Sequence, residues 1–233
     1  MKSLFTVCLL AVMVITFNGC KKNHDDKKRN CRIITATPIP GGDGYIFTYG
    51  ADGKLSSASL GPSFIQYANT GTTKIVTTTT SGQFVSKVII INNAAGLALN
   101  VRTEFNPAGT NWTNTVYEYT GEELKKSTTT DSSGTTSSVT DYVWVNHNMV
   151  TGGTAGSTPT TFDYFLDKPH QQGDFFFLLQ TLQGYEIYRP KNLLKEFGGS
   201  TFTYDFNADG NISLLGVISG GNTTFLQYQY QCD

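Results

Sequence analysis

Charged side chains are scarce in this chain. Asp, Glu, Lys and Arg together make up 15% of its 233 residues, and the formal net charge is −1. A protein that binds nucleic acid needs a basic face for the phosphate backbone, so this balance argues against nucleic acid as a partner. Intracellular enzymes usually carry more charge and more helix, so the composition is untypical of that class.

Residues that commonly perform catalysis are few. The chain has three histidines, which fall in a predicted polar leader (His24), a turn (His147) and a loop (His170), and all three are interpreted as solvated residues. No Gly-x-Ser-x-Gly sequence and no glycine-rich phosphate loop occurs. The sequence therefore predicts no cofactor and favours a protein that is not an enzyme.

Paired carboxylates offer one alternative, because a glycan hydrolase needs two acids in one cleft. Acidic residues on predicted strands supply the candidates, although acids on strands usually lie at the surface. These candidates are Glu104, Glu118, Glu122, Asp141 and Asp163.

No apolar run is long enough for a membrane-spanning helix. The longest, residues 4–17, would extend roughly 21 Å as a helix, against about 30 Å for the hydrocarbon core of a bilayer. It follows a short basic start, Met1-Lys2-Ser3, so residues 1–19 are predicted to be a signal peptide.

A cysteine follows this run directly, in Phe17-Asn18-Gly19-Cys20-Lys21-Lys22. The arrangement resembles the lipobox of bacterial lipoproteins, and Gly-Cys-Lys resembles the form found in Bacteroidetes. The departure is Phe17-Asn18, where the usual pattern has Leu and a small residue. The resemblance implies a lipid on Cys20, a tether over 20–30, and an outer-membrane lipoprotein on the periplasmic or cell-surface side.

Cysteine is also rare, with four residues in all. Cys8 lies in the apolar run, which leaves Cys31 and Cys232 near the two ends of residues 31–233. An even pair in an exported chain predicts a disulfide, with two buried free thiols as the alternative. Two such distant cysteines without a histidine pair lack the spacing of a metal site.

Threonine and aromatic residues are abundant, which favours strands. Alternating segments separated by turns every 8–12 residues predict one all-β domain over 31–233. We expect a curled antiparallel meander of about a dozen strands, which either stays open or closes part of the way into a barrel. Residues 171–183 are the exception and predict one short helix, with Asp174 as N-cap, that covers an open end or a face.

One stretch has two interpretations. Asp205, Asn207, Asp209 and Gly210 match the first half of a calcium-binding loop, but Gly216 stands where the loop needs an acid. Residues 204–213 also align without a gap with residues 47–56, whose Asp52-Gly53 matches only the turn. The shared pattern favours two β-hairpins.

These aromatic-x-Tyr and Asp-Gly-x-Leu units, with a looser copy at residues 117–124, resemble YD/RHS-like repeats. They are similar to repeats in Bacteroidetes lipoproteins of the DUF4595 kind. The resemblance implies a large antiparallel sheet and brings no catalytic residues.

Trp112 and Trp144 are the candidate ligand-binding aromatics, since both lie on predicted neighbouring strands. If their rings face outward they can stack on sugars; if inward, they belong to the core. The sequence thus predicts a lipid-anchored envelope protein that binds a glycan or envelope protein or has a structural role, with glycan binding or hydrolysis as the alternative.

Overall fold

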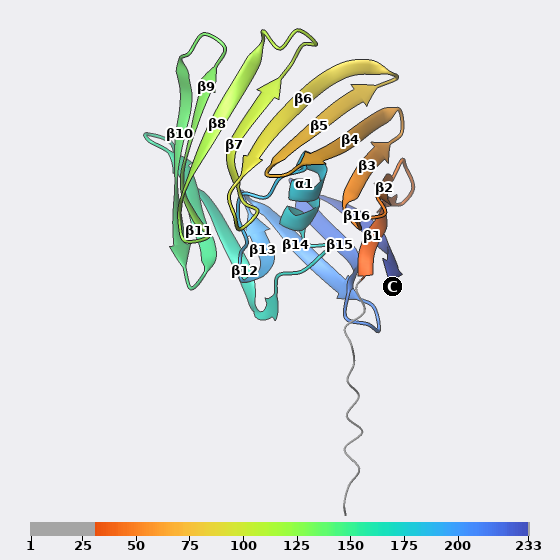
Figure 1. Ribbon diagram of the computed structural model, residues 1–233. Helices are drawn as coiled ribbons and strands as arrows, with labels where there is room; N and C mark the ends of the chain where they lie inside the picture. Colours follow the sequence, from red (N-terminus) through yellow and green to blue (C-terminus); the bar gives the residue numbers. More distant parts are fainter. Residues whose placement is uncertain (1–30, 233) are drawn as a thin grey trace, which may run out of the picture.

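The computed structural model describes residues 31–232, which form sixteen antiparallel strands and one helix. Each strand pairs with its neighbours in the sequence, and β1 pairs with β16, so the sheet closes into a barrel (Figure 1). The all-β meander with one short helix is therefore confirmed. The expectation of about a dozen strands and partial closure was wrong, since closure is complete and all sixteen strands find both partners within these residues.

The strands run in chain order with the helix α1, Phe175–Gln183, between β12 and β13. Their bounds are β1 Cys31–Ile39, β2 Tyr45–Tyr49, β3 Leu55–Leu60, β4 Ser63–Thr70, β5 Thr73–Thr80, β6 Gln83–Asn92, β7 Ala98–Glu104, β8 Trp112–Thr120, β9 Glu123–Asp131, β10 Thr136–Val145, β11 Asn148–Thr154, β12 Thr160–Pro169, β13 Asn192–Phe197, β14 Ser200–Phe206, β15 Ile212–Ser219 and β16 Asn222–Cys232.

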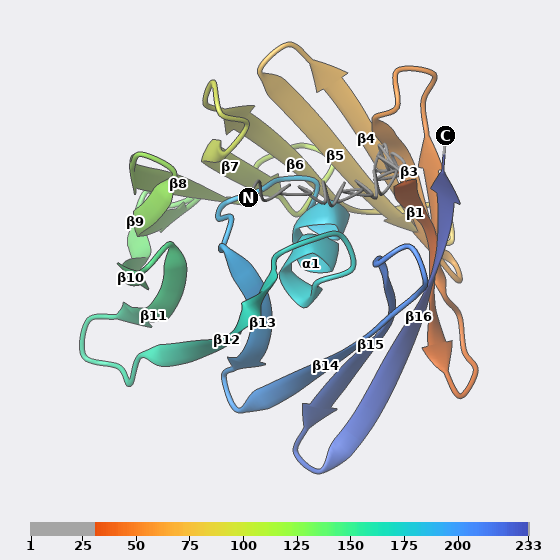
Figure 2. The same cartoon turned by 90° about the horizontal axis from the view of Figure 1, so that it is seen from below.

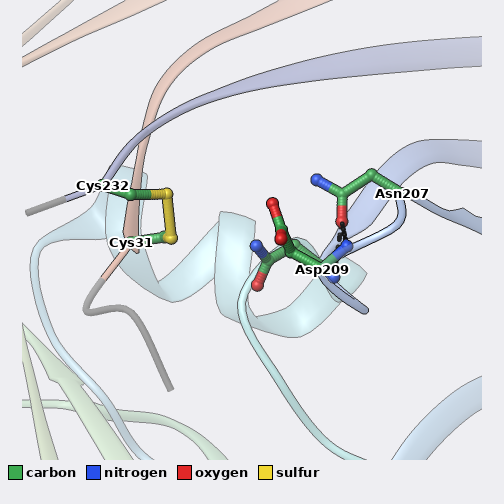
Figure 3. Close-up of a disulfide and its surroundings, with 5 residues drawn as sticks. Cys31, Asn207, Asp209 and Cys232 are labelled. Atoms are coloured by element: carbon green, nitrogen blue, oxygen red, sulfur yellow. Dashed lines mark hydrogen bonds between the residues drawn. A yellow bond between two sulfur atoms is a disulfide. The ribbon is translucent and has the colours of Figure 1, made fainter. Parts of the chain in front are cut away.

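The seam between β1 and β16 carries the predicted disulfide. Cys31 and Cys232 are paired across the two strands and joined through their sulfur atoms (Figure 3). The same register continues to Ile39 and Phe225, so main-chain pairing and the covalent bond close the barrel at the same place.

Both Asp-Gly sequences form the hairpin turns that the repeat predicted. Gly53 between β2 and β3 and Gly210 between β14 and β15 have φ angles of 75° and 79°, a region in which glycine is favoured. Each glycine N–H donates to the carbonyl three residues earlier, at 2.9 Å and 3.0 Å. The aligned sequences thus adopt the same turn.

Aromatic side chains fill the inside of the barrel. Alternate residues of a strand point to opposite faces, and the inward positions carry buried tyrosines such as Tyr67, Tyr117 and Tyr228. Several tyrosine hydroxyls donate to main-chain carbonyls, among them Tyr67 to Leu182 at 3.0 Å. The core of this protein therefore lies inside the ring of strands.

The helix α1 lies inside the ring, as the view from below shows (Figure 2). Asp174 is its N-cap as predicted, and Gly184 ends it in the left-handed conformation. Apolar residues occupy several sides of the helix, as expected of a helix surrounded by a wall. Of the two expected positions, an open end or a face, the helix covers a face, the inner one of β13 and β14, because a ring of sixteen strands is wide enough to enclose it.

One side of α1 is fixed to β12, β13 and β14. Asp174 is fully buried, and its carboxylate accepts hydrogen bonds from Phe176 N at 2.7 Å, Leu194 N at 3.0 Å and the Tyr204 hydroxyl at 3.3 Å. Phe176 packs edge-on against Phe197, with ring centroids 5.5 Å apart. These contacts leave the opposite side of the helix, with Phe177 and Thr181, facing β3 and β5 across a cavity.

Candidate functional site

A cavity of about 250 Å³ separates α1 from the wall formed by β3, β5 and β6. We call it the α1 cavity. It is slightly smaller than the usual ligand pocket, for which the range is roughly 300–1,000 Å³. Its lining consists of Leu55, Lys74, Asn92, Gly96, His170, Phe177, Gln180, Thr181, Gly184, Tyr185 and Glu186.

Lys74 brings a positive charge into this cavity. It follows the inward alternation of β5, on the same face as the buried Val76. Burial lowers the pKa of its ammonium group, while the nearby Glu186 carboxylate acts in the opposite direction. Its ammonium group is thus partly desolvated, a state in which an added anionic partner is favourable.

Two further polar groups of the lining have no partner. Asn92 Oδ1 and His170 Nδ1 are buried and make no hydrogen bond within the described residues. The nearest acid to His170 is Asp174, with Nδ1 and Oδ1 3.7 Å apart, which is too far for a hydrogen bond. Buried polar atoms are normally paired, so these two are exceptions, although neither has accessible surface on the cavity.

The segment after α1 forms one rim of the cavity and is held in place at both ends. Gln180 Oε1 accepts hydrogen bonds from Ile187 N at 2.7 Å and Tyr188 N at 3.3 Å. The Glu186 carboxylate accepts two hydrogen bonds from the Arg189 guanidinium, at 2.7 Å and 2.8 Å. Glu186 is therefore already neutralised by its own cation.

A second cavity, of about 290 Å³, adjoins the first. Leu55, Phe177 and Thr181 line both, so the two spaces meet along α1. Here the Arg32 guanidinium lies 5.0 Å from the centre of the Tyr49 ring, and its buried Nε has no hydrogen-bond partner among residues 31–232. The combined site has an aromatic and aliphatic floor with one cation in each part.

Comparison with known proteins gives fold relatives only. No family model matches the chain, and no curated protein matches it by sequence. Solved structures that share its fold include two from Bacteroides. A porin-like protein from Bacteroides uniformis ATCC 8492 aligns with a TM-score of 0.59 and 14% identity, over 87% of this chain and 96% of that one.

The second is a porin-like protein from Bacteroides vulgatus ATCC 8482, with a TM-score of 0.56 and 13% identity, over 85% of this chain and 98% of that one. At such low identity the likeness establishes the barrel architecture alone. Among residues 31–232, no helix has the length and hydropathy needed to span a bilayer.

The two candidate tryptophans lie on opposite faces of the sheet. Trp144 packs against the core, and its indole N–H donates to Leu124 O at 2.7 Å. Trp112 follows the outward alternation of β8 with Val116, and the Arg102 guanidinium lies 4.4 Å from its ring centre. They therefore cannot form one stacking platform.

The candidate acids also do not lie together in the α1 cavity. Glu104 pairs with Lys87 and Arg102, Asp163 with Lys195, and Glu122 with Arg189. Burial alone would raise the pKa of the Glu104 carboxyl, but hydrogen bonds from Arg102 and Lys87 hold it below its usual value. None of the five acids lines the α1 cavity, whose single carboxylate is Glu186.

The residues that match the first half of a calcium-binding loop stabilise the hairpin turn between β14 and β15 instead. Asn207 Oδ1 accepts hydrogen bonds from the main-chain N–H groups of Asp209 and Asn211, both at 3.0 Å (Figure 3). Within residues 31–232, no three His, Cys, Asp or Glu side chains lie close enough to hold a metal ion. Cys20, the predicted lipid site, lies outside the described residues.

Sequence reasoning missed the residues that line the cavity. His170 was interpreted as solvated, but its side chain is only 17% exposed, because the loop before α1 turns into the barrel. His147, with 79% of its side chain exposed, is the solvated turn residue that was expected. No sequence signal marked Lys74, because its strand, β5, is mostly threonine and resembles a solvated face.

Proposed function

We propose that this protein is a lipid-anchored cell-envelope protein that binds a small molecule in the α1 cavity. The observation that carries the proposal is an apolar floor beside a lysine that forms no ion pair within residues 31–232. Phe177 and Leu55 supply the floor, and Lys74 lines the same cavity. Concave sites with a few convergent polar groups are the usual form of small-molecule sites.

Three features support the envelope location. Gly19-Cys20-Lys21 follows an apolar run of signal-peptide length, and a polar segment separates Cys20 from the first strand. The disulfide suits an oxidising compartment. The fold relatives from Bacteroides are porin-like proteins, which agrees with an envelope protein.

The wall of the barrel supports a position in water beside the membrane. Barrels that cross membranes have an apolar outer band and a polar interior. This wall differs from both, because its inner face is aromatic and its outer face mixes exposed apolar side chains, such as Phe64 and Val143, with charged ones. The outward charges within neighbouring strands include Lys87, Arg102, Glu118 and Lys126. We therefore place the barrel outside the bilayer, held by the lipid on Cys20.

Glycan hydrolysis is not favoured. It requires two carboxyl groups about 5–10 Å apart across a cleft. The α1 cavity contains one, Glu186, and Arg189 already neutralises it. A second function is therefore not proposed.

Filling the cavity should abolish binding. Thr181 lines both cavities from a half-buried position on α1, so Thr181→Trp places an indole in the shared space. We expect the barrel, produced from Lys21 onward, to bind the uncharged probe phenylnaphthylamine with a rise in fluorescence, and Thr181→Trp to lose at least tenfold in affinity. Fluorescence titration measures both.

The matched control is Thr201→Trp, which adds the same side chain at an exposed position of β14. It should bind the probe as the wild type does. Equal binding by wild type and Thr181→Trp, or no binding by the wild type, would rule out the α1 cavity as the site.

A further inference from the structure

We infer that the molecule bound in the α1 cavity is an amphipathic anion, with its charged group beside Lys74 and its apolar part along Phe177 and Leu55. This inference rests on the proposed function and adds the chemical class of the ligand. It follows from the charges and the apolar surface of the site.

The charges of the site favour an anion. Lys74 and Arg32 each line one of the two neighbouring cavities, and neither forms an ion pair within residues 31–232. Glu186, the only acid in either lining, already accepts two hydrogen bonds from Arg189. A ligand with a negative charge therefore supplies the counter-ion that the protein does not.

The apolar surface of the site favours a ligand that also has an apolar part. Phe177 and Leu55 lie where the two cavities meet, Tyr185 lines the first cavity and Tyr49 lines the second. An inorganic anion would leave this surface in contact with water, whereas an aromatic or alkyl group covers it. A fully apolar molecule, in turn, would leave the desolvated Lys74 ammonium without a partner.

Two fluorescent probes separate the effect of the ligand's charge on binding from the effect of its shape. Anilinonaphthalene sulfonate is phenylnaphthylamine with an added sulfonate, so the pair differs by one negative charge. We expect Lys74→Gln to lower the affinity for the sulfonate probe about tenfold, because one charge-assisted hydrogen bond is lost. The affinity for the neutral probe should stay within twofold of the wild-type value. Lys126→Gln removes a cation from the outer wall beside Glu118 and should change neither.

The outcomes distinguish the two claims. If Lys74→Gln binds both probes as the wild type does, while Thr181→Trp binds neither, the cavity is a binding site and the anion inference is wrong. If the wild type binds neither probe, the proposed function itself fails. Circular dichroism of each variant shows whether a loss of binding comes from a loss of fold.

Competition identifies the source of the anion. Lysophosphatidylglycerol represents an acid derived from the membrane and indole lactate a soluble aromatic acid. Displacement of the sulfonate probe by either, with no displacement by uncharged decanol at equal concentration, supports an amphipathic anion and names its source. Failure of both acids, or equal displacement by decanol, overturns the inference.

Discussion

The barrel is expected to unfold cooperatively near pH 11, and its tyrosines should ionise in the same step. Tyr67, Tyr117, Tyr164, Tyr204 and Tyr228 are buried, and burial raises the pKa of each phenol. Above about pH 10 the unfolded chain loses these protons and the folded barrel keeps them, so stability falls as pH rises. Five such groups cost roughly 7 kcal/mol at pH 11, comparable with the roughly 5–15 kcal/mol that holds a typical domain together.

Tyrosinate absorbance and circular dichroism, followed together against pH, measure this transition. Tyr228→Phe is the matched variant, because the Tyr228 hydroxyl is buried without a hydrogen-bond partner and its loss removes one titrating group at little cost. Its transition should move to higher pH. Tyrosines that ionise gradually around pH 10 in a barrel that stays folded would show that their hydroxyls are not enclosed.

Loss of the disulfide should destabilise the barrel by up to about 5 kcal/mol. The bridge links residues 201 positions apart, and closing so long a loop restricts the unfolded chain strongly. For the Cys31→Ala/Cys232→Ala double variant we expect a melting temperature lower by about 10–20 °C, measured by calorimetry. The strand pairing of β1 with β16 should keep the variant folded at room temperature.

Reduced wild-type protein provides the control for this variant, since it lacks the bridge but keeps both side chains. Its melting temperature should equal that of the double variant. A melting temperature within about 2 °C of the oxidised wild type in both samples would mean that the seam holds the barrel without the covalent bond.

Local sequence was enough to predict the turns and the nature of the strands. Asp52-Gly53 and Asp209-Gly210 form the turns that the alignment indicated, because a tight hairpin depends on a few adjacent residues. Asp174 was identified as an N-cap on the same grounds. Complete closure depends on the pairing of β1 with β16, almost the whole chain apart, so local sequence could not predict it. The predicted bridge between Cys31 and Cys232 was the one indication that the first and last strands are neighbours.

The candidate site lay beyond sequence reasoning because its residues come from five separate segments. Lys74 and Asn92 lie on β5 and β6, whereas Phe177 lies on α1, more than eighty residues later. The helix was predicted, but its position inside the barrel was not, and that position creates the cavity. The two tryptophans were predicted as ligand-binding residues from their residue type alone. Strand alternation points Trp144 into the barrel and Trp112 away from it.

The compartment of an unlipidated barrel tests the central claim most directly. Residues 21–233 would be exported behind a cleavable signal peptide that leaves no cysteine at position 20, and the cells would be fractionated without detergent. A water-facing barrel held only by lipid should appear folded in the soluble periplasmic fraction, while the natural leader keeps it with the membrane. Unlipidated protein that stays in the membrane and needs detergent for release would contradict the account.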